Sequence, residues 1–271
     1  MVEHSWYVPS FVKNMYASVH CYNPLKDILM PVFTSINQIA KSPHLLPAHT
    51  RRPRRLLFHW RGQVLYHFPN YSFGIRQQVC DLYSDRAGSS KWRDQGILVS
   101  GKHSVKYLDE MLSSKFCGVF PGNGWGHIET PILLGCIPVV VQDAILTPWE
   151  NVLDFSSFAL RLPRSDIPRL PEILRAVPES KIASMQEAMS RVWERFTYSS
   201  LVVAEHDRQC NWPMANRDTC QQLKRKFALE GRRRLPPKPR KLSGRDAIDT
   251  LMQVLQARLL SQQQGGQNKV A

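Results

Sequence analysis

The stretch SSKFCGVFPGNGWGHIETPILLGCIPVVVQD, residues 113–143, decides the fold of this chain. Its short apolar run Phe116–Phe120 predicts a buried strand. Glu129–Leu134 is long enough for one or two helical turns, and Gly135 ends them. The β-branched run Ile137–Val141 predicts a second strand, covered on both faces as in a parallel sheet. The stretch therefore predicts a strand, a loop, a short helix and a strand.

The loop between the first strand and the helix is rich in glycine. Gly122, Gly124 and Gly126 allow a sharp turn and a close approach of the backbone to a ligand. A loop that leads from a strand into a helix also gathers unpaired N–H groups at the positive end of that helix. The sequence therefore predicts a phosphate-binding site at residues 122–126.

The same alternation of strands and helices continues on both sides of this stretch. Strands are predicted at Leu56–Trp60, Gly96–Ser100 and Phe158–Leu162, and helices at residues 72–82, 105–112, 166–177 and 178–196. A regular order of strand and helix is typical of a doubly wound parallel sheet. The predicted fold class is therefore α/β.

The composition indicates a globular protein with an anionic partner. The chain has 271 residues, 43% of them hydrophobic and 21% charged, which excludes an intrinsically disordered protein. Its net charge is +14. Sugar nucleotides, sulfated or uronate-rich glycans, anionic membranes and RNA would all suit such a charge. No signal peptide follows Met1, and no apolar run approaches the roughly 20 residues of a membrane span.

The six cysteines are too few for a disulfide scaffold. Cys80, Cys117 and Cys136 lie in apolar runs, so we expect buried thiols there. Cys210 and Cys220 flank a polar loop and would be able to pair in an oxidising compartment. The sequence leaves that pairing open.

Several blocks of the chain resemble the exostosin-type glycosyltransferases, the family 47 type. They are SKFCGVFPGNGWG, Glu129, GCIPVVVQD and TPWENVLDF, preceded in the same order by Lys26–Ser35, Leu56–Gly62 and Tyr71–Val79. The resemblance covers roughly residues 24–200. It implies a Rossmann-like sheet that forms the C-terminal, donor-binding half of a GT-B glycosyltransferase. It also implies transfer of a sugar, with inversion, from a UDP-linked or similar donor to a glycan acceptor in the Golgi apparatus.

The candidate donor-binding residues follow the carboxyl ends of the predicted strands, where parallel sheets bind ligands. They are Arg61, Arg76, Gly122, Asn123, Gly124, Trp125, Gly126, His127, Glu129 and Asp143. The resemblance assigns Glu129 to the ribose hydroxyls of the donor. A structural role stays open for each of these residues, and no catalytic base is assigned. The sequence contains no D-x-D motif, so we expect a metal-independent reaction without a further cofactor.

We divide the chain into five parts. Residues 1–50 are expected to be the remnant of an N-terminal domain with its linker, and residues 51–205 the nucleotide-sugar domain. A basic loop, 206–242, a bracing helix, 243–260, and a disordered tail, 261–271, follow. The helix carries an apolar stripe of Ile248, Leu251, Leu255 and Leu259, which we expect to be buried against the body. Membrane attachment is expected only through an N-terminal anchor missing from this sequence.

Two other functions compete with the transferase. A non-catalytic partner or glycan-binding protein would keep the same fold, and a homo- or hetero-oligomer with a related transferase stays open. A nucleic-acid binder would use the basic run 224–241. That run lacks the interleaved aromatic residues of such modules, so we expect no nucleic-acid partner.

Overall fold

The structure is a computed structural model that describes residues 27–34, 36–39, 41–46, 53–84, 90–122, 127–143, 145–198 and 245–267. Some of the predictions above lie outside the described residues. They concern residues 1–26, Asn123, Gly124, Trp125, Gly126, Cys210, Cys220, the basic run 224–241 and residues 268–271.

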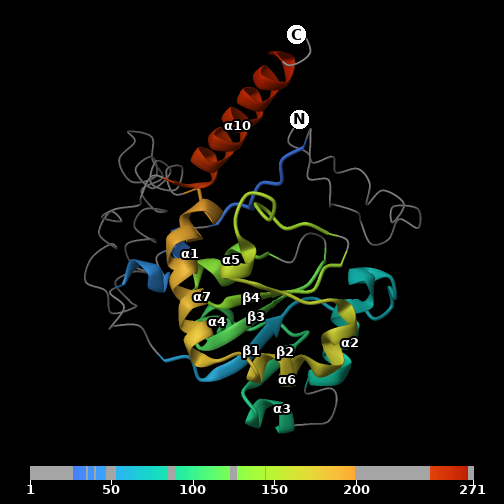
Figure 1. The fold of residues 1–271 in the computed structure, drawn as a ribbon. Helices are drawn as coiled ribbons and strands as arrows, with labels where there is room; N and C mark the ends of the chain where they lie inside the picture. Colours follow the sequence, from blue (N-terminus) through green and yellow to red (C-terminus); the bar gives the residue numbers. More distant parts are fainter. Residues whose placement is uncertain are drawn as a thin grey trace, which may run out of the picture.

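The centre of the molecule is a parallel sheet of five strands (Figure 1). The strands are β1 Leu56–Arg61, β2 Ile97–Ser100, β3 Ser114–Val119, β4 Ile137–Val140 and β5 Leu160–Arg161. Their order is β2-β1-β3-β4-β5, and every pair is parallel. The predicted α/β fold with a doubly wound parallel sheet is confirmed.

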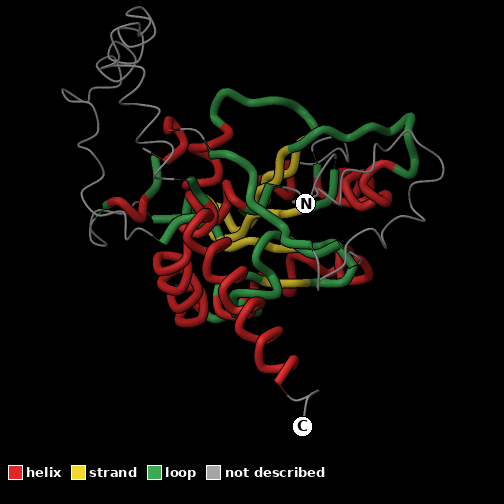
Figure 2. The backbone as a smooth tube through the Cα atoms, turned by 90° about the horizontal axis from the view of Figure 1, so that it is seen from above, coloured by secondary structure: helices red, strands yellow, loops and turns green. Residues whose placement is uncertain are grey.

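Helices surround the strands (Figure 2). The α-helices are α1 Ile36–Ile39, α2 Ile75–Tyr83, α3 Ser90–Asp94, α4 Tyr107–Leu112, α5 Glu129–Leu133, α6 Leu170–Arg175, α7 Glu179–Val192 and α10 Ala247–Gln267. Short 3-10 turns are η2 Pro43–Leu45, η4 Tyr71–Gly74, η6 Phe155–Ser157, η7 Arg164–Arg169 and η8 Trp193–Phe196. The apolar segment Lys26–Pro31 predicts a strand, but residues 27–34 contain none, so this prediction is wrong for the described segment.

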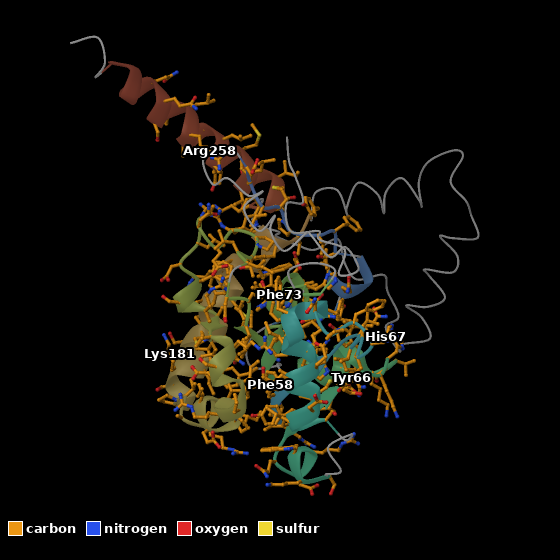
Figure 3. The ribbon with its side chains drawn as sticks, turned by 90° about the vertical axis from the view of Figure 1, so that its right-hand side faces the viewer. Phe58, Tyr66, His67, Phe73, Lys181 and Arg258 are labelled. Atoms are coloured by element: carbon orange, nitrogen blue, oxygen red, sulfur yellow. A yellow bond between two sulfur atoms is a disulfide. The ribbon has the colours of Figure 1, made fainter. Side chains whose placement is uncertain are left out.

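The two faces of β1 meet different surroundings because successive side chains of a strand alternate. Phe58 and Trp60 point into the larger core, where Phe58 is fully buried at the centre of the body (Figure 3). His59 and Arg61 point to the other face and reach Glu110 of α4. Both faces of the sheet are thus covered, which explains the nearly continuous apolar runs of its strands.

Cys117 and Cys136 form a disulfide, so the expectation of two buried thiols is wrong. Cys117 lies in β3 and Cys136 immediately precedes β4, and pairing of Phe116 with Ile137 makes these strands neighbours. The two Cα atoms are 5.7 Å apart, within the reach of a disulfide. The apolar sequence around Cys117 and Cys136 suggested free thiols, but the pairing of β3 with β4 brings the two cysteines close enough to bond. Cys80 is a buried free thiol, as predicted.

The base of α10 packs on the body. The N–H of Ala247, which is buried, donates to the carbonyl of Thr197 at 2.9 Å. Farther along the helix, Arg258 donates to the carbonyl of Asp27 at 2.8 Å. The helix therefore ties the segment around residue 27 to the region of η8.

The rest of α10 projects away from the body (Figure 1). Leu251 packs against the core, but Ile248 and Leu255 are each 39% exposed and Leu259 is 60% exposed. The expectation of a buried stripe is therefore wrong for these three residues, because the described part of the body covers only one side of the helix. The helix also continues to Gln267, so residues 261–267 are helical where we expected disorder. No helix in the described part of the chain has the length and apolar character to span a membrane.

We expect the disulfide to contribute to stability. It joins residues 19 positions apart in sequence and so restricts the unfolded chain. In Cys117→Ser/Cys136→Ser the free energy of unfolding should fall by about 3 kcal/mol, as measured by chemical denaturation. Dithiothreitol should destabilise the natural chain and leave the double variant unchanged. Alkylation of both cysteines in the denatured, unreduced protein would contradict the cross-link.

Candidate active site

A cavity of about 290 Å³ opens at the carboxyl edge of the sheet, beside β1 and β3. From β1 the chain moves outward to β2 on one side, whereas β3, β4 and β5 extend the sheet on the other. The strand order thus reverses between β1 and β3, and open α/β sheets bind ligands at such a switch point. The cavity is lined by Trp60, Arg61, Gly62, Gln63, Tyr71, Arg76, Tyr107, Met111, Gly118, His127 and Pro131.

Arg76 places a buried cation at this cavity. It belongs to α2 and is 8% exposed. Its Nη1 donates to the Tyr71 hydroxyl at 2.9 Å and to the Gln63 carbonyl at 3.1 Å, and its Nη2 donates to the Phe120 carbonyl at 3.1 Å. Burial lowers the pKa of the Arg76 guanidinium from its usual value, yet arginine stays protonated in proteins.

These contacts position Arg76 without neutralising it. All three acceptors are uncharged oxygens, and the guanidinium also lies over the rings of Trp60 and Tyr71, at 5.6 and 5.3 Å from their centroids. Within the described part of the chain, its Nε–H has no hydrogen-bond partner. A buried charge is costly unless it is paired. The arrangement is therefore suited to an anionic ligand.

Gly122, the first glycine of the predicted loop, is required by the position of Arg76. A Cβ atom at residue 122 would overlap the guanidinium. The glycine thus allows the backbone after β3 to pass directly beside the cation.

His127 brings a titratable ring to the same cavity. Its backbone has a φ of 56°, in the left-handed region that non-glycine residues seldom adopt. Desolvation, followed by the positive charge of Arg76, lowers the pKa of His127. The ring is therefore neutral at pH 7, when it is able both to donate and to accept a hydrogen bond.

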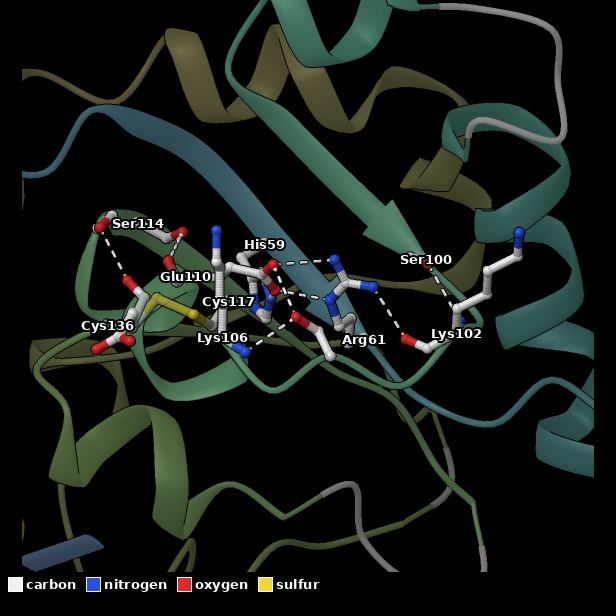
Figure 4. A network of polar contacts seen from close by, with 12 residues as sticks. His59, Arg61, Ser100, Lys102, Lys106, Glu110, Ser114, Cys117 and Cys136 are labelled. Atoms are coloured by element: carbon white, nitrogen blue, oxygen red, sulfur yellow. Dashed lines mark hydrogen bonds and ion pairs between the residues drawn. A yellow bond between two sulfur atoms is a disulfide. The ribbon is translucent and has the colours of Figure 1, made fainter.

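Arg61 is held in an ion-pair network on the other side of β1 (Figure 4). Its Nε and Nη2 donate to the two carboxylate oxygens of Glu110 at 2.6 and 3.0 Å, and its Nη1 donates to the Lys102 carbonyl at 2.9 Å. His59, which is fully buried, contacts the same carboxylate at 3.2 Å through Nε2. The charge of Arg61 is thus neutralised by protein, whereas that of Arg76 is not.

Burial and the contacts among Arg61, Glu110 and His59 shift the pKa values of both Glu110 and His59. Burial raises the pKa of Glu110, but hydrogen bonds from Arg61 and His59 outweigh it and hold the pKa below its usual value. Burial lowers the pKa of His59 to about 4, against the opposing effect of Glu110. His59 is therefore neutral in the folded protein and donates from Nε2. Sequence analysis missed Glu110, because no motif marks it and only the packing of α4 on β1 brings it to Arg61.

Glu129 and Asp143 are not among the residues that line the cavity. Glu129 is 1% exposed, and its Oε1 accepts the N–H of Val32 at 2.9 Å. Asp143 accepts the N–H of Arg164 at 3.1 Å, which is a capping contact. The ribose role of Glu129 and the sugar contact of Asp143 stay predictions. Of the predicted residues, the cavity brings together Arg61, Arg76 and His127, with Gly122 directly behind Arg76.

Fold and cavity together define an α/β protein with a crevice at its switch point that holds the buried guanidinium of Arg76. Comparison with known families then places the chain: residues 6–177, more than half of it, match the family model described as the Exostosin GT47 domain. The chain belongs to this exostosin family. The resemblance noted in the sequence is thereby confirmed.

Similar proteins include transferases from plants and animals. A probable glucuronosyltransferase of Oryza sativa subsp. japonica is 27% identical over 178 residues, which cover 61% of this chain and 39% of the relative. Exostosin-2 of Mus musculus is 26% identical over 199 residues, 69% of this chain and 26% of the relative. A probable beta-1,4-xylosyltransferase of Arabidopsis thaliana is 26% identical over 157 residues, 54% and 34% of the two chains. The chain therefore spans less than half the length of these relatives.

The buried imidazole of His59 makes stability depend on pH. The unfolded ring takes up a proton near pH 6.5 but the folded ring only near pH 4, so acidification between these values favours unfolding. Between pH 7 and pH 4.5 the contribution of His59 to the free energy of unfolding should fall by roughly 2–3 kcal/mol. Urea unfolding at both pH values measures the loss.

The matched variants for this measurement are His59→Gln and His67→Gln. His59→Gln should reduce the pH dependence, because its amide does not titrate. His67 is exposed, so His67→Gln should keep the dependence of the natural chain. Equal pH dependence in His59→Gln and the natural chain would show that this ring is not the titrating group.

Proposed function

We propose that this chain is the donor-binding half of a glycosyltransferase that transfers a sugar from a nucleoside diphosphate donor to a glycan. The diphosphate binds in the cavity beside β1 and β3. Arg76 faces its negative charge and His127 donates a hydrogen bond to it. The sequence predicts that backbone N–H groups of residues 122–126 complete the contact. Electrostatic stabilisation of the departing diphosphate is the main catalytic need of such a transfer.

The observation that carries this proposal is the state of Arg76. A guanidinium that is buried, fixed by neutral acceptors and placed at a switch point has its charge available for a ligand. Family membership supports the same reading, because relatives are named as glucuronosyltransferases and xylosyltransferases. We infer a uridine diphosphate donor, transfer with inversion and no requirement for a metal ion.

The disulfide supports a secretory location. Structural disulfides persist in oxidising compartments and are rare in the cytosol. The Cys117–Cys136 bond packs in a small apolar cluster with Met111 and Leu134, and both cysteines are 0% exposed. A transferase that acts on glycans in the Golgi lumen would fold under conditions that keep this bond oxidised.

A non-catalytic, glycan-binding partner is the second candidate. One observation favours it: no carboxylate lines the cavity among the described residues, and His127 is the sole titratable base there besides tyrosine. Such a protein would bind the nucleotide or the glycan without transfer. Release of UDP from a UDP-sugar in the presence of acceptor would favour the enzyme, and nucleotide binding without release would favour the partner.

Removal of the Arg76 charge tests the donor site. In Arg76→Gln the affinity for UDP should fall about tenfold or more, since hydrogen bonds to charged groups contribute about 1.5–3 kcal/mol. Gly122→Ala should also weaken binding, because it displaces the guanidinium without removing it. Calorimetry measures both affinities.

The control for this test is Arg191→Gln. Arg191 is an exposed arginine of α7 paired with Glu187, so its loss should leave UDP affinity unchanged. Circular dichroism must show that each variant is folded, since Arg76 is buried. Undiminished UDP affinity in folded Arg76→Gln would remove the basis of the proposed function.

Metal independence has its own test. The sequence has no D-x-D motif, and the described residues contain no cluster of three or more His, Cys, Asp or Glu side chains suited to a metal ion. We expect the affinity for UDP to be the same with EDTA as with Mn²⁺, because protein donors supply the positive charge. A loss of binding in EDTA that Mn²⁺ restores would show instead that a metal bridges the diphosphate.

A further inference from the structure

A second concavity, of about 700 Å³, lies at the opposite edge of the sheet. It lies at the amino-terminal ends of β1, β2 and β3 and is open to solvent. Its lining residues are Arg55, Leu56, Leu57, Arg93, Asp94, Gln95, Gly96, Lys115 and Arg175. This surface is separate from the cavity beside the carboxyl ends, since the length of β1, about 20 Å, lies between them.

Four cations from four different elements meet in this concavity. Arg55 precedes β1, Arg93 belongs to α3, Lys115 to β3 and Arg175 to α6. Asp94 is the one acid among the described residues that line it. Like charges that are gathered in one place repel one another, so the arrangement favours an anionic ligand.

Arg55 is placed by the residue before it. Arg54 donates to the carbonyls of Met111, Ser114 and Leu134 at 3.1, 2.8 and 2.6 Å, which fixes the chain where it enters β1. Arg55 is exposed and lines the concavity. Its charge is thus presented from an anchored backbone and not from a loose loop.

The charges of Arg175 and Lys115 are also accessible to a ligand. Arg175 donates to the side-chain oxygen of Gln95 at 2.5 Å, and an amide positions the guanidinium without neutralising it. Lys115 pairs with Glu179, whose side chain is 75% exposed. An ion pair with an exposed partner contributes little to stability, so a ligand anion would replace Glu179 at a low cost in free energy.

We propose that this concavity binds an acidic glycan, a linear chain that carries carboxylate or sulfate groups. Several spaced cations around an open surface suit a ligand with repeated charges, whereas a single phosphate would engage few of them. The choice of a glycan rests on the proposed function, because a glycosyltransferase would hold part of its acceptor or product here, and the cations favour an acidic one. Binding at this edge leaves the donor cavity free.

The test measures binding of a fluorescent hyaluronate octasaccharide, whose glucuronate units carry carboxylates, by anisotropy with the full chain. Arg55→Ala/Arg175→Ala should weaken binding about tenfold or more, because hydrogen bonds between charged groups are the strong ones. The matched control Arg169→Ala/Arg191→Ala removes the same charge from exposed arginines elsewhere and should change affinity less than twofold. Added salt should weaken binding to the natural chain.

Three further measurements distinguish glycan binding at this concavity from binding in the donor cavity and from binding to lipid. UDP affinity should be unchanged in Arg55→Ala/Arg175→Ala, and saturating UDP should not displace the octasaccharide. Absence of glycan binding, displacement by UDP, or an equal loss in both double variants would overturn the proposal. So would binding to phosphatidylserine vesicles in place of the glycan. Glycan binding by a chain that fails to bind UDP would keep this site and reject the donor site, so the two failures are distinguishable.

Discussion

The parallel pairing of β1 with β3 is the constraint on which the candidate site depends. It places Arg61, which ends β1, and Gly62, which follows it, beside the carboxyl end of β3. Because β1 then leads outward to β2, no helix connects β1 directly to β3, and a crevice opens between their carboxyl ends. Arg76 reaches this crevice from α2 and His127 from the loop after β3. Each element contributes one group, and only the sheet brings them together.

The two arginines of the crevice show how neighbouring charges acquire different roles. Arg61 has a bidentate carboxylate partner in Glu110, and the same carboxylate accepts a hydrogen bond from His59, which burial keeps neutral. Arg76 has only carbonyl and hydroxyl oxygens around it. A paired arginine keeps the wall of the cavity in place, whereas an unpaired one attracts an anion. The difference follows from the partners and not from burial, since both side chains are largely buried.

Sequence patterns predicted the strands of the sheet, but they did not predict the contacts that the strands make with each other and with the helices. The strands predicted at Leu56–Trp60, Phe116–Phe120 and Ile137–Val141 correspond to β1, β3 and β4, because each is an apolar run bounded by turn signals. The disulfide and the pairing of Glu110 with Arg61 were missed, since both join residues through strand order and helix packing, which a linear pattern does not contain. The exposed stripe of α10 was misjudged for a related reason: periodicity shows that a face is apolar but not whether a surface lies opposite it.

The disulfide has a second consequence for the site. Cys117 and Cys136 enclose the end of β3, the glycine loop, His127 and α5 in one covalent ring. A shift of either end of the loop after β3 would move His127 away from Arg76, because both residues line the same cavity. Pairing of β3 with β4 supplies that register, and the cross-link keeps it when local opening separates the strands. The bond therefore constrains the segment that carries His127 more directly than the sheet as a whole.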